Sequence, residues 1–189
     1  MTVRRCTARR PIGRLCLLPL LLAAAFAVGS ARAADLPSAG DIDAISHTLG
    51  FVEGMPHAGK IRIGVVYDGS AETGRSDAAK VVDAISAGAG PGSTQLGAVG
   101  IAAADIGTAA DVDALLLMPG LKAFTRDIVA AATRRHLPTI STDPQCIEQQ
   151  LCVLWVQAEP RVSVTLNTGL AEALSVRISP IFAMMVKRK

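Results

Sequence analysis

The segment from Gly69 to Ser76 has the residue types and spacing closest to a known chemical motif. It reads Gly-Ser-Ala-Glu-Thr-Gly-Arg-Ser. Four residues separate Gly69 from Gly74, and Arg75 and Ser76 follow Gly74 directly. A Gly-x-x-x-x-Gly-[basic]-Ser frame between a strand and a helix is typical of loops whose backbone N–H groups hold phosphate. Arginine replaces the lysine of nucleotide-hydrolysing loops, which disfavours hydrolysis. Two interpretations stay open: an anion or small polar ligand at the helix start, and a plain surface loop in which Ser76 caps the helix.

Two aspartates, Asp68 and Asp143, are the other residues whose chemistry stands out. Paired carboxylates can act as general acid and base, but aspartates that follow strands more simply form turns and caps. No Gly-x-Ser-x-Gly motif is present, and His47, His57 and His136 form no recognisable catalytic frame with serine or cysteine. We therefore predict a protein that is not an enzyme, with no catalytic residue, metal site or cofactor.

The elements that must position these residues are predicted to form a mostly parallel sheet. The run from Ile61 to Tyr67 is almost wholly apolar, as expected of a strand covered on both faces. Two strand–helix–strand units in series favour an α/β fold with a doubly wound sheet, a single Rossmann-like lobe. The other expected elements are a helix capped by Asp41 and ended by Gly54, strands at 94–101, 114–118 and 137–142, and helices at 77–87 and 121–136.

Ligands of doubly wound sheets bind beyond the carboxyl ends of the strands. In this chain that edge carries the glycine loop after the first strand and the turn after the fourth. The residues expected to bind a ligand are Tyr67, Asp68, Gly69, Gly74, Arg75, Ser76, Thr142 and Asp143.

The last part of the chain changes character and predicts an antiparallel hairpin. Its arms are 151–157 and 161–167, and the second arm alternates apolar and polar residues. A helix is expected from Thr168 and another from Pro180. Ile181, Phe182, Met184 and Met185 on the last helix are expected to pack into the core.

The first 33 residues have the features of a cleaved signal peptide. A basic segment is followed by an apolar run of about 14 residues, shorter than the roughly 20 of a membrane-spanning helix, and then by Ala31-Arg32-Ala33.

Six of the 19 basic side chains and none of the 16 acidic ones precede residue 34. Thirteen basic against sixteen acidic side chains give residues 34–189 a net charge of −3, which argues against nucleic-acid binding. We expect a polar segment at 34–40, one domain at 41–189 and a periplasmic location. The basic clusters Arg134-Arg135 and Lys187-Arg188-Lys189 are expected at solvated helix ends.

Two cysteines, Cys146 and Cys152, lie beyond the signal peptide. In an oxidising compartment a lone pair at this spacing is most simply a disulfide that closes a small loop.

A set of short motifs places the chain near a known family. Phe51-Val52-Glu53 precedes Pro56, the strand reads Ile-Arg-Ile-Gly-Val-Val, and Leu-Leu-Leu-Met-Pro, the cysteine loop and the hairpin follow. Together with Asn167-x-x-x-Ala171 and Val176-Arg177-Ile178-Ser179, they resemble the YfiR-type periplasmic regulators. The resemblance implies one lobe of a type 1 periplasmic binding protein and a role in holding an inner-membrane diguanylate cyclase inactive.

Two functions follow as hypotheses. The first is a periplasmic regulator that binds a membrane protein partner, such as a diguanylate cyclase or a sensor. The second is a single-lobe solute-binding component of an ABC-type uptake system. One lobe does not close a ligand cleft by itself, so a small solute would require a homodimer or a partner.

Overall fold

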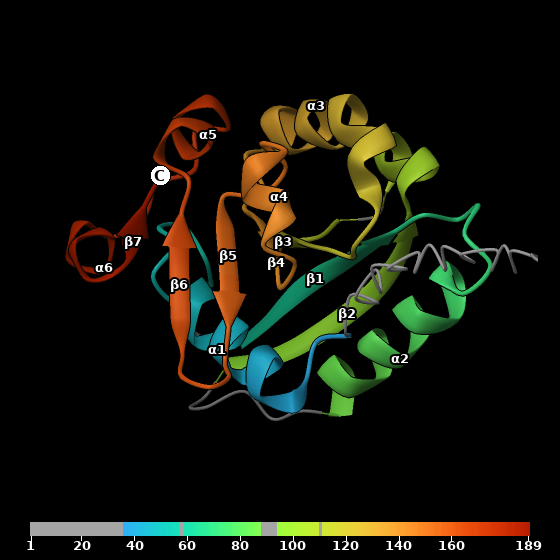
Figure 1. Ribbon diagram of the computed structural model, residues 1–189, viewed down its shortest axis with the longest axis horizontal. Helices are drawn as coiled ribbons and strands as arrows, with labels where there is room; N and C mark the ends of the chain where they lie inside the picture. The colour runs from blue at the N-terminus through green and yellow to red at the C-terminus, as the bar shows by residue number, and fades with distance from the viewer. Residues whose placement is uncertain (1–35, 57–58, 88–93, 110) are drawn as a thin grey trace, which may run out of the picture. The chain divides into compact units, whose positions relative to one another are not determined.

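The computed structural model describes residues 36–56, 59–87, 94–109 and 111–189, and Figure 1 shows how they are arranged. The predicted signal peptide and His57 lie outside the described residues. Within those ranges, no helix has the length and apolarity needed to cross a bilayer. The elements are α1 Ala39–Leu49, β1 Gly59–Tyr67, α2 Gly74–Ala87, β2 Thr94–Ala102, η1 Ala103–Thr108, β3 Ala114–Leu117, η2 Leu121–Phe124, α3 Thr125–Arg135, β4 Thr139–Ser141, α4 Gln145–Glu148, β5 Leu154–Gln157, β6 Ser163–Leu166, α5 Thr168–Ala173, α6 Pro180–Met185 and β7 Lys187–Arg188.

The strands form one sheet in the order β2-β1-β3-β4-β5-β6-β7. The neighbours from β2 to β5 are parallel, β5 and β6 are antiparallel, and β7 runs parallel to β6. This arrangement confirms the predicted α/β class, the mostly parallel sheet of a Rossmann-like lobe and the C-terminal hairpin. Strand β7 was not predicted: Lys187 and Arg188 lie on a sheet edge and not at a helix end.

Helices cover both faces of the parallel part. The chain moves from β1 to β2 in one direction across the sheet and from β3 to β4 in the other. Because such crossovers are right-handed, the two connecting helices fall on opposite faces. Figure 1 shows this: α2 and α3 lie on opposite sides of β1 and β2.

The core is built around the middle strands. Ile63 and Val65 of β1 are 1% and 0% exposed, and all four residues of β3 are buried. A strand packed on both faces needs apolar side chains pointing both ways, which explains the nearly unbroken apolar runs. Burial of each such side chain contributes about 1.5–3 kcal/mol.

Helix α1 begins and ends earlier than the sequence suggested. Ser38, not Asp41, is the N-cap: Ser38 Oγ accepts the Asp41 N–H, and Asp41 Oδ2 accepts the Ser38 N–H in return. Asp41 Oδ1 also accepts the Ala158 N–H at 2.8 Å, which ties the helix to the β5–β6 turn. The helix ends at Leu49 with Gly50 as its C-cap, before Gly54.

Helix α6 also departs from expectation. Phe182 is buried, but Ile181, Met184 and Met185 are exposed and do not join the core. Six residues make fewer than two turns, so only one side of this short helix packs on the protein, and that side carries Phe182. Figure 1 shows α6 at one extremity of the described fold, beyond the edge strand β7.

The predicted disulfide is confirmed. Cys146 of α4 is bonded to Cys152 just before β5, with a Cα–Cα separation of 5.5 Å. Both cysteines are buried, at 4% and 0% exposed.

Candidate functional site

Asp68 follows β1 directly and organises the glycine loop from within. Its Oδ1 accepts the Ser70 N–H at 2.8 Å and the Ser70 hydroxyl at 2.6 Å. These bonds hold the pKa of the Asp68 carboxyl below its usual range, and the bond from the Ser70 hydroxyl has the largest effect. The carboxylate is thus an acceptor in an Asx turn. An anion in this loop would have to compete with it for the Ser70 donors.

The rest of the loop passes straight into α2. The helix begins at Gly74, and Ser76 Oγ donates to the Thr73 carbonyl at 2.8 Å. Ser76 therefore does not cap the helix, which corrects that part of the surface-loop interpretation. A side chain at Gly74 would collide with the Asp68 carbonyl oxygen, so glycine is required for this close approach. Arg75 is exposed.

The predicted residues after β4 lie at the same edge of the sheet. Asp143 Oδ1 accepts the Gln145 N–H at 3.0 Å, a second Asx turn, which leads into α4. The Thr142 carbonyl accepts the Trp155 indole N–H at 3.0 Å. Because β1, β3 and β4 are parallel, the topology brings Asp68 and Asp143 to one edge, where both form turns.

Two adjoining hollows of about 500 and 440 Å³ lie at the opposite, amino-terminal edge. The loops around them precede β1, β3 and β4 or follow α5, so sequence reasoning, which looked to the carboxyl edge, missed them. Most of the apolar wall residues are buried, and charged residues stand around them. The hollow of about 440 Å³ is lined by Val52–Pro56, Val112, Asp113, Arg135–Pro138 and Ser175–Arg177. The hollow of about 500 Å³ shares His136 and Ser175–Arg177 with it and adds Ala171 and Glu172.

Two helix ends shape these hollows. His136 follows the end of helix α3, and Ser175 lies two residues after the end of helix α5; these residues have φ values of 54° and 56°. The Leu137 N–H donates to the Ala132 carbonyl, and the Val176 N–H to the Ala171 carbonyl. Both are the long-range bonds of a Schellman motif, whose left-handed position is usually glycine. With His136 and Ser175 there instead, two polar side chains are placed at the hollow.

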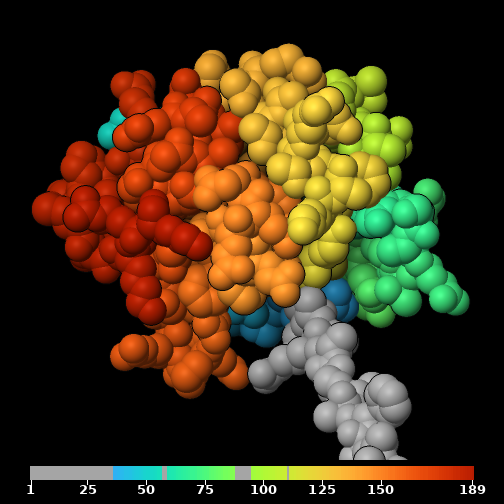
Figure 2. All heavy atoms as spheres, turned by 45° about the horizontal axis from the view of Figure 1, so that its top comes forward, coloured from blue at the N-terminus to red at the C-terminus, as the bar shows by residue number. Residues whose placement is uncertain are grey.

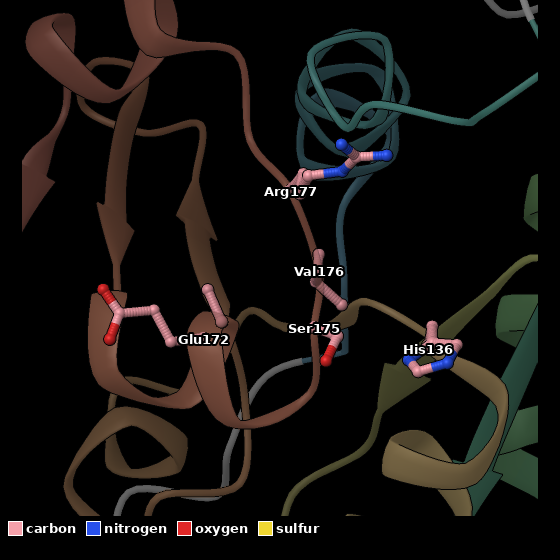
Figure 3. Close-up of a pocket in the computed structure, with 6 residues that line it drawn as sticks. His136, Glu172, Ser175, Val176 and Arg177 are labelled. Atoms are coloured by element: carbon pink, nitrogen blue, oxygen red, sulfur yellow. The ribbon is translucent and has the colours of Figure 1, made fainter.

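His136 connects the two helix ends. Its Nδ1 lies 3.2 Å from the Leu174 carbonyl oxygen, so it donates the hydrogen bond and leaves Nε2 as the other ring nitrogen. Figure 3 shows the Ser175–Arg177 segment between His136 on one side and Glu172 on the other. The Glu172 carboxylate points away from both His136 and Arg177.

Charges of both signs border the hollows. Arg177 Nε lies 3.6 Å from Glu53 Oε2, and both side chains are largely exposed. Asp113 Oδ2 accepts the Arg62 N–H at 2.7 Å, which fixes its carboxylate at the start of β3. The rim of the hollows, made by these residues, therefore has both acidic and basic side chains.

The arrangement is suited to binding. Among the described residues, no cluster of three or more His, Cys, Asp or Glu side chains could hold a metal ion. His136 Nδ1 is hydrogen-bonded to a backbone carbonyl and not to a carboxylate or a nucleophile. What the hollows offer is an apolar wall with charged groups around it, a combination typical of recognition surfaces.

Comparison with protein-family models finds no match, and neither does comparison with curated proteins. Two solved structures are similar to this chain. An ABC domain from Streptococcus pneumonia in complex with L-Trp is 13% identical with a TM-score of 0.53, over 80% of this chain and 61% of that one. A conserved domain protein from Vibrio cholerae is 15% identical with a TM-score of 0.49, over 82% and 61%. The chain thus spans 61% of the length of each.

Proposed function

We propose that this chain is an exported, non-enzymatic binding protein: a periplasmic regulator that binds a membrane protein through the hollows at its amino-terminal edge. The sequence resemblance to YfiR-type regulators supports this assignment. The buried disulfide supports export, because disulfides persist in oxidising compartments such as the periplasm.

The main support for this proposal is that the site is open to solvent. Small-molecule sites enclose most of their ligand and converge a few polar groups on it. Here the Glu172 and Arg177 side chains point apart (Figure 3), and the hollow that they border is open to solvent. An open surface with an apolar wall and alternating charges fits a protein segment that is wider than the hollow itself.

The test is affinity capture from detergent-solubilised membranes with the exported protein as bait. Charge reversal by Arg177→Glu with Glu172→Lys keeps the net charge but reverses these two charges of the rim. Arg134→Glu with Glu148→Lys is the matched control on exposed residues away from the lining. We expect a membrane protein that the wild type and the control retain and the rim variant loses. Equal retention by all three proteins would contradict the proposal.

A second candidate is the single-lobe solute-binding component. The shared fold with a domain solved in complex with L-Trp favours it, and the carboxyl edge with Tyr67, Asp68, Gly69, Gly74, Arg75, Ser76, Thr142 and Asp143 would be its binding site. A ligand at one hundred times its Kd raises the unfolding free energy by about 2.7 kcal/mol. Thermal shift against L-tryptophan, other amino acids and phosphate distinguishes the candidates. A shift abolished by Arg75→Ala or Asp143→Asn would favour the solute-binding function.

A further inference from the structure

Helix α6 presents an apolar face to solvent. Ile181, Met184 and Met185 are 66%, 76% and 66% exposed. Phe182, on the same helix, is buried and stacks on Phe51 with ring centroids 4.4 Å apart. The aromatic side therefore holds α6 on the protein, and the three apolar side chains face outward.

Three cations follow α6 closely in the chain. Lys187, Arg188 and Lys189 are all exposed. They do not form a free tail, because Lys187 pairs with Thr165 across the sheet and the Lys189 N–H donates to the Leu166 carbonyl at 2.9 Å. The edge strand β7 thus fixes the cations next to α6.

Charge is segregated along the chain. From Ala173 to the last residue the sequence has Arg177, Lys187, Arg188 and Lys189 and neither Asp nor Glu. Residues 34–172 have nine basic and sixteen acidic side chains. The field of the protein therefore turns its C-terminal end, and not its body, toward an anionic surface.

We propose that the α6 face, defined as Ile181, Met184, Met185 and Lys187–Lys189, binds the surface of a bilayer that has anionic headgroups. Exposed apolar side chains on a short helix can enter the boundary between headgroups and acyl chains. Adjacent lysine and arginine side chains are attracted to anionic lipids, each contributing about fivefold to the partition coefficient. The apolar and electrostatic terms together give reversible attachment.

The shape of this face favours a bilayer over a protein surface. The three side chains are exposed on α6, which lies at an extremity of the described fold (Figure 1), and Figure 2 shows the C-terminal segment on one side of it. A protein partner would need formed pockets for three side chains, two of them flexible methionines. A fluid bilayer accommodates projecting side chains without such pockets. This inference does not depend on the proposed regulatory function.

The test is co-sedimentation of the exported protein with vesicles, its amino terminus determined by mass spectrometry. One set of vesicles contains phosphatidylglycerol and phosphatidylethanolamine, and the other only phosphatidylcholine. The apolar variant is Ile181→Gln, Met184→Gln and Met185→Gln, with Val162→Gln as control because Val162 is 67% exposed on the hairpin. The charge variant is Lys187→Glu with Arg188→Glu, and its control is Arg126→Glu with Arg134→Glu, which changes the net charge equally at exposed sites on α3. Circular dichroism checks that every variant folds.

We expect the wild type to sediment with phosphatidylglycerol vesicles, more weakly as salt rises. The charge variant should lose about 25-fold or more in affinity, since it removes two attractive charges and adds two repulsive ones. The apolar variant should lose about tenfold, and both controls should bind as the wild type does. Absence of wild-type sedimentation with anionic vesicles at low salt would overturn the proposal. Equal loss in a variant and its control, or unchanged binding in both folded variants, would do the same.

Discussion

The rings of Phe51 and Phe182 stack with centroids 4.4 Å apart and an interplanar angle of 10°. Phe51 follows α1, and Phe182 lies on α6, so this contact joins the two ends of the described fold. The Ser179 N–H donates to the Phe51 carbonyl at 2.9 Å and holds the same junction. Stacked aromatic pairs contribute about 0.5–1.5 kcal/mol beyond the area they bury.

We predict that Phe182→Ala lowers the free energy of unfolding by about 3 kcal/mol, because it leaves a cavity and exposes the face of Phe51. Urea denaturation followed by circular dichroism measures the change. Ile181→Ala is the control on the neighbouring residue, which is 66% exposed, and should stay within about 0.5 kcal/mol of the wild type. Similar losses in the two variants would show that α6 is not held by Phe182.

The disulfide closes a loop between residues six apart in sequence. Cross-linking restricts the unfolded chain, and for a loop this short the expected stabilisation is about 2 kcal/mol. Cys146→Ser with Cys152→Ser should therefore lower the unfolding free energy by that amount. The wild type, denatured without reductant, should show no free thiol at these positions. Two reactive thiols would mean that the bond does not form in the cell.

Gly74 and Gly69 are two glycines of one loop with different surroundings. An added side chain at Gly74 would meet the Asp68 carbonyl oxygen, whereas at Gly69 it would meet the Ala102 side chain at 3.4 Å, an ordinary contact. Gly74→Ala should destabilise the protein by about 1–3 kcal/mol, since backbone must shift to admit the methyl group. Gly69→Ala should cost clearly less, and thermal unfolding of the two variants gives the comparison. The reverse order would contradict the loop geometry.

The carboxyl of Asp68 should titrate below the usual aspartate range. Hydrogen bonds from the Ser70 hydroxyl and N–H favour its charged form and lower its pKa. Because the folded-state pKa is depressed, the contribution of these bonds to stability is present above the unfolded-state pKa and is lost as pH falls through the folded-state pKa. NMR titration of the side-chain carboxyl carbon measures this, and the Ser70 amide should shift with it. In Asp68→Asn that amide shift should disappear; its persistence would assign the titration to another group.

The strongly patterned parts of the fold were predictable. Ile63 to Tyr67 and Ala114 to Leu117 are apolar because both faces of these strands are covered, and such runs identify buried strands directly. The cysteine pair was predictable from its spacing and from the signal peptide expected before it.

The caps and the hollows depended on contacts between distant segments. Ser38 and Asp41 both suit a helix start, and the choice between them is fixed partly by the bond from the Ala158 N–H. His136 and Ser175 adopt left-handed backbone where glycine is usual, so the sequence has no marker for these helix ends. The exposure of α6 was missed because methionine is common in cores, and a helix of six residues cannot bury every apolar side chain it has.

Photo-crosslinking in the cell tests most directly the claim that the chain binds a membrane protein through its amino-terminal edge. A photoreactive phenylalanine analogue replaces Arg177 or Glu172 at that edge and, in separate strains, Asp143 at the carboxyl edge. We predict that irradiation yields one adduct with a membrane protein from positions 172 and 177 and none from position 143. Adducts from position 143 alone, or none from either edge in cells where the protein is exported, would contradict it.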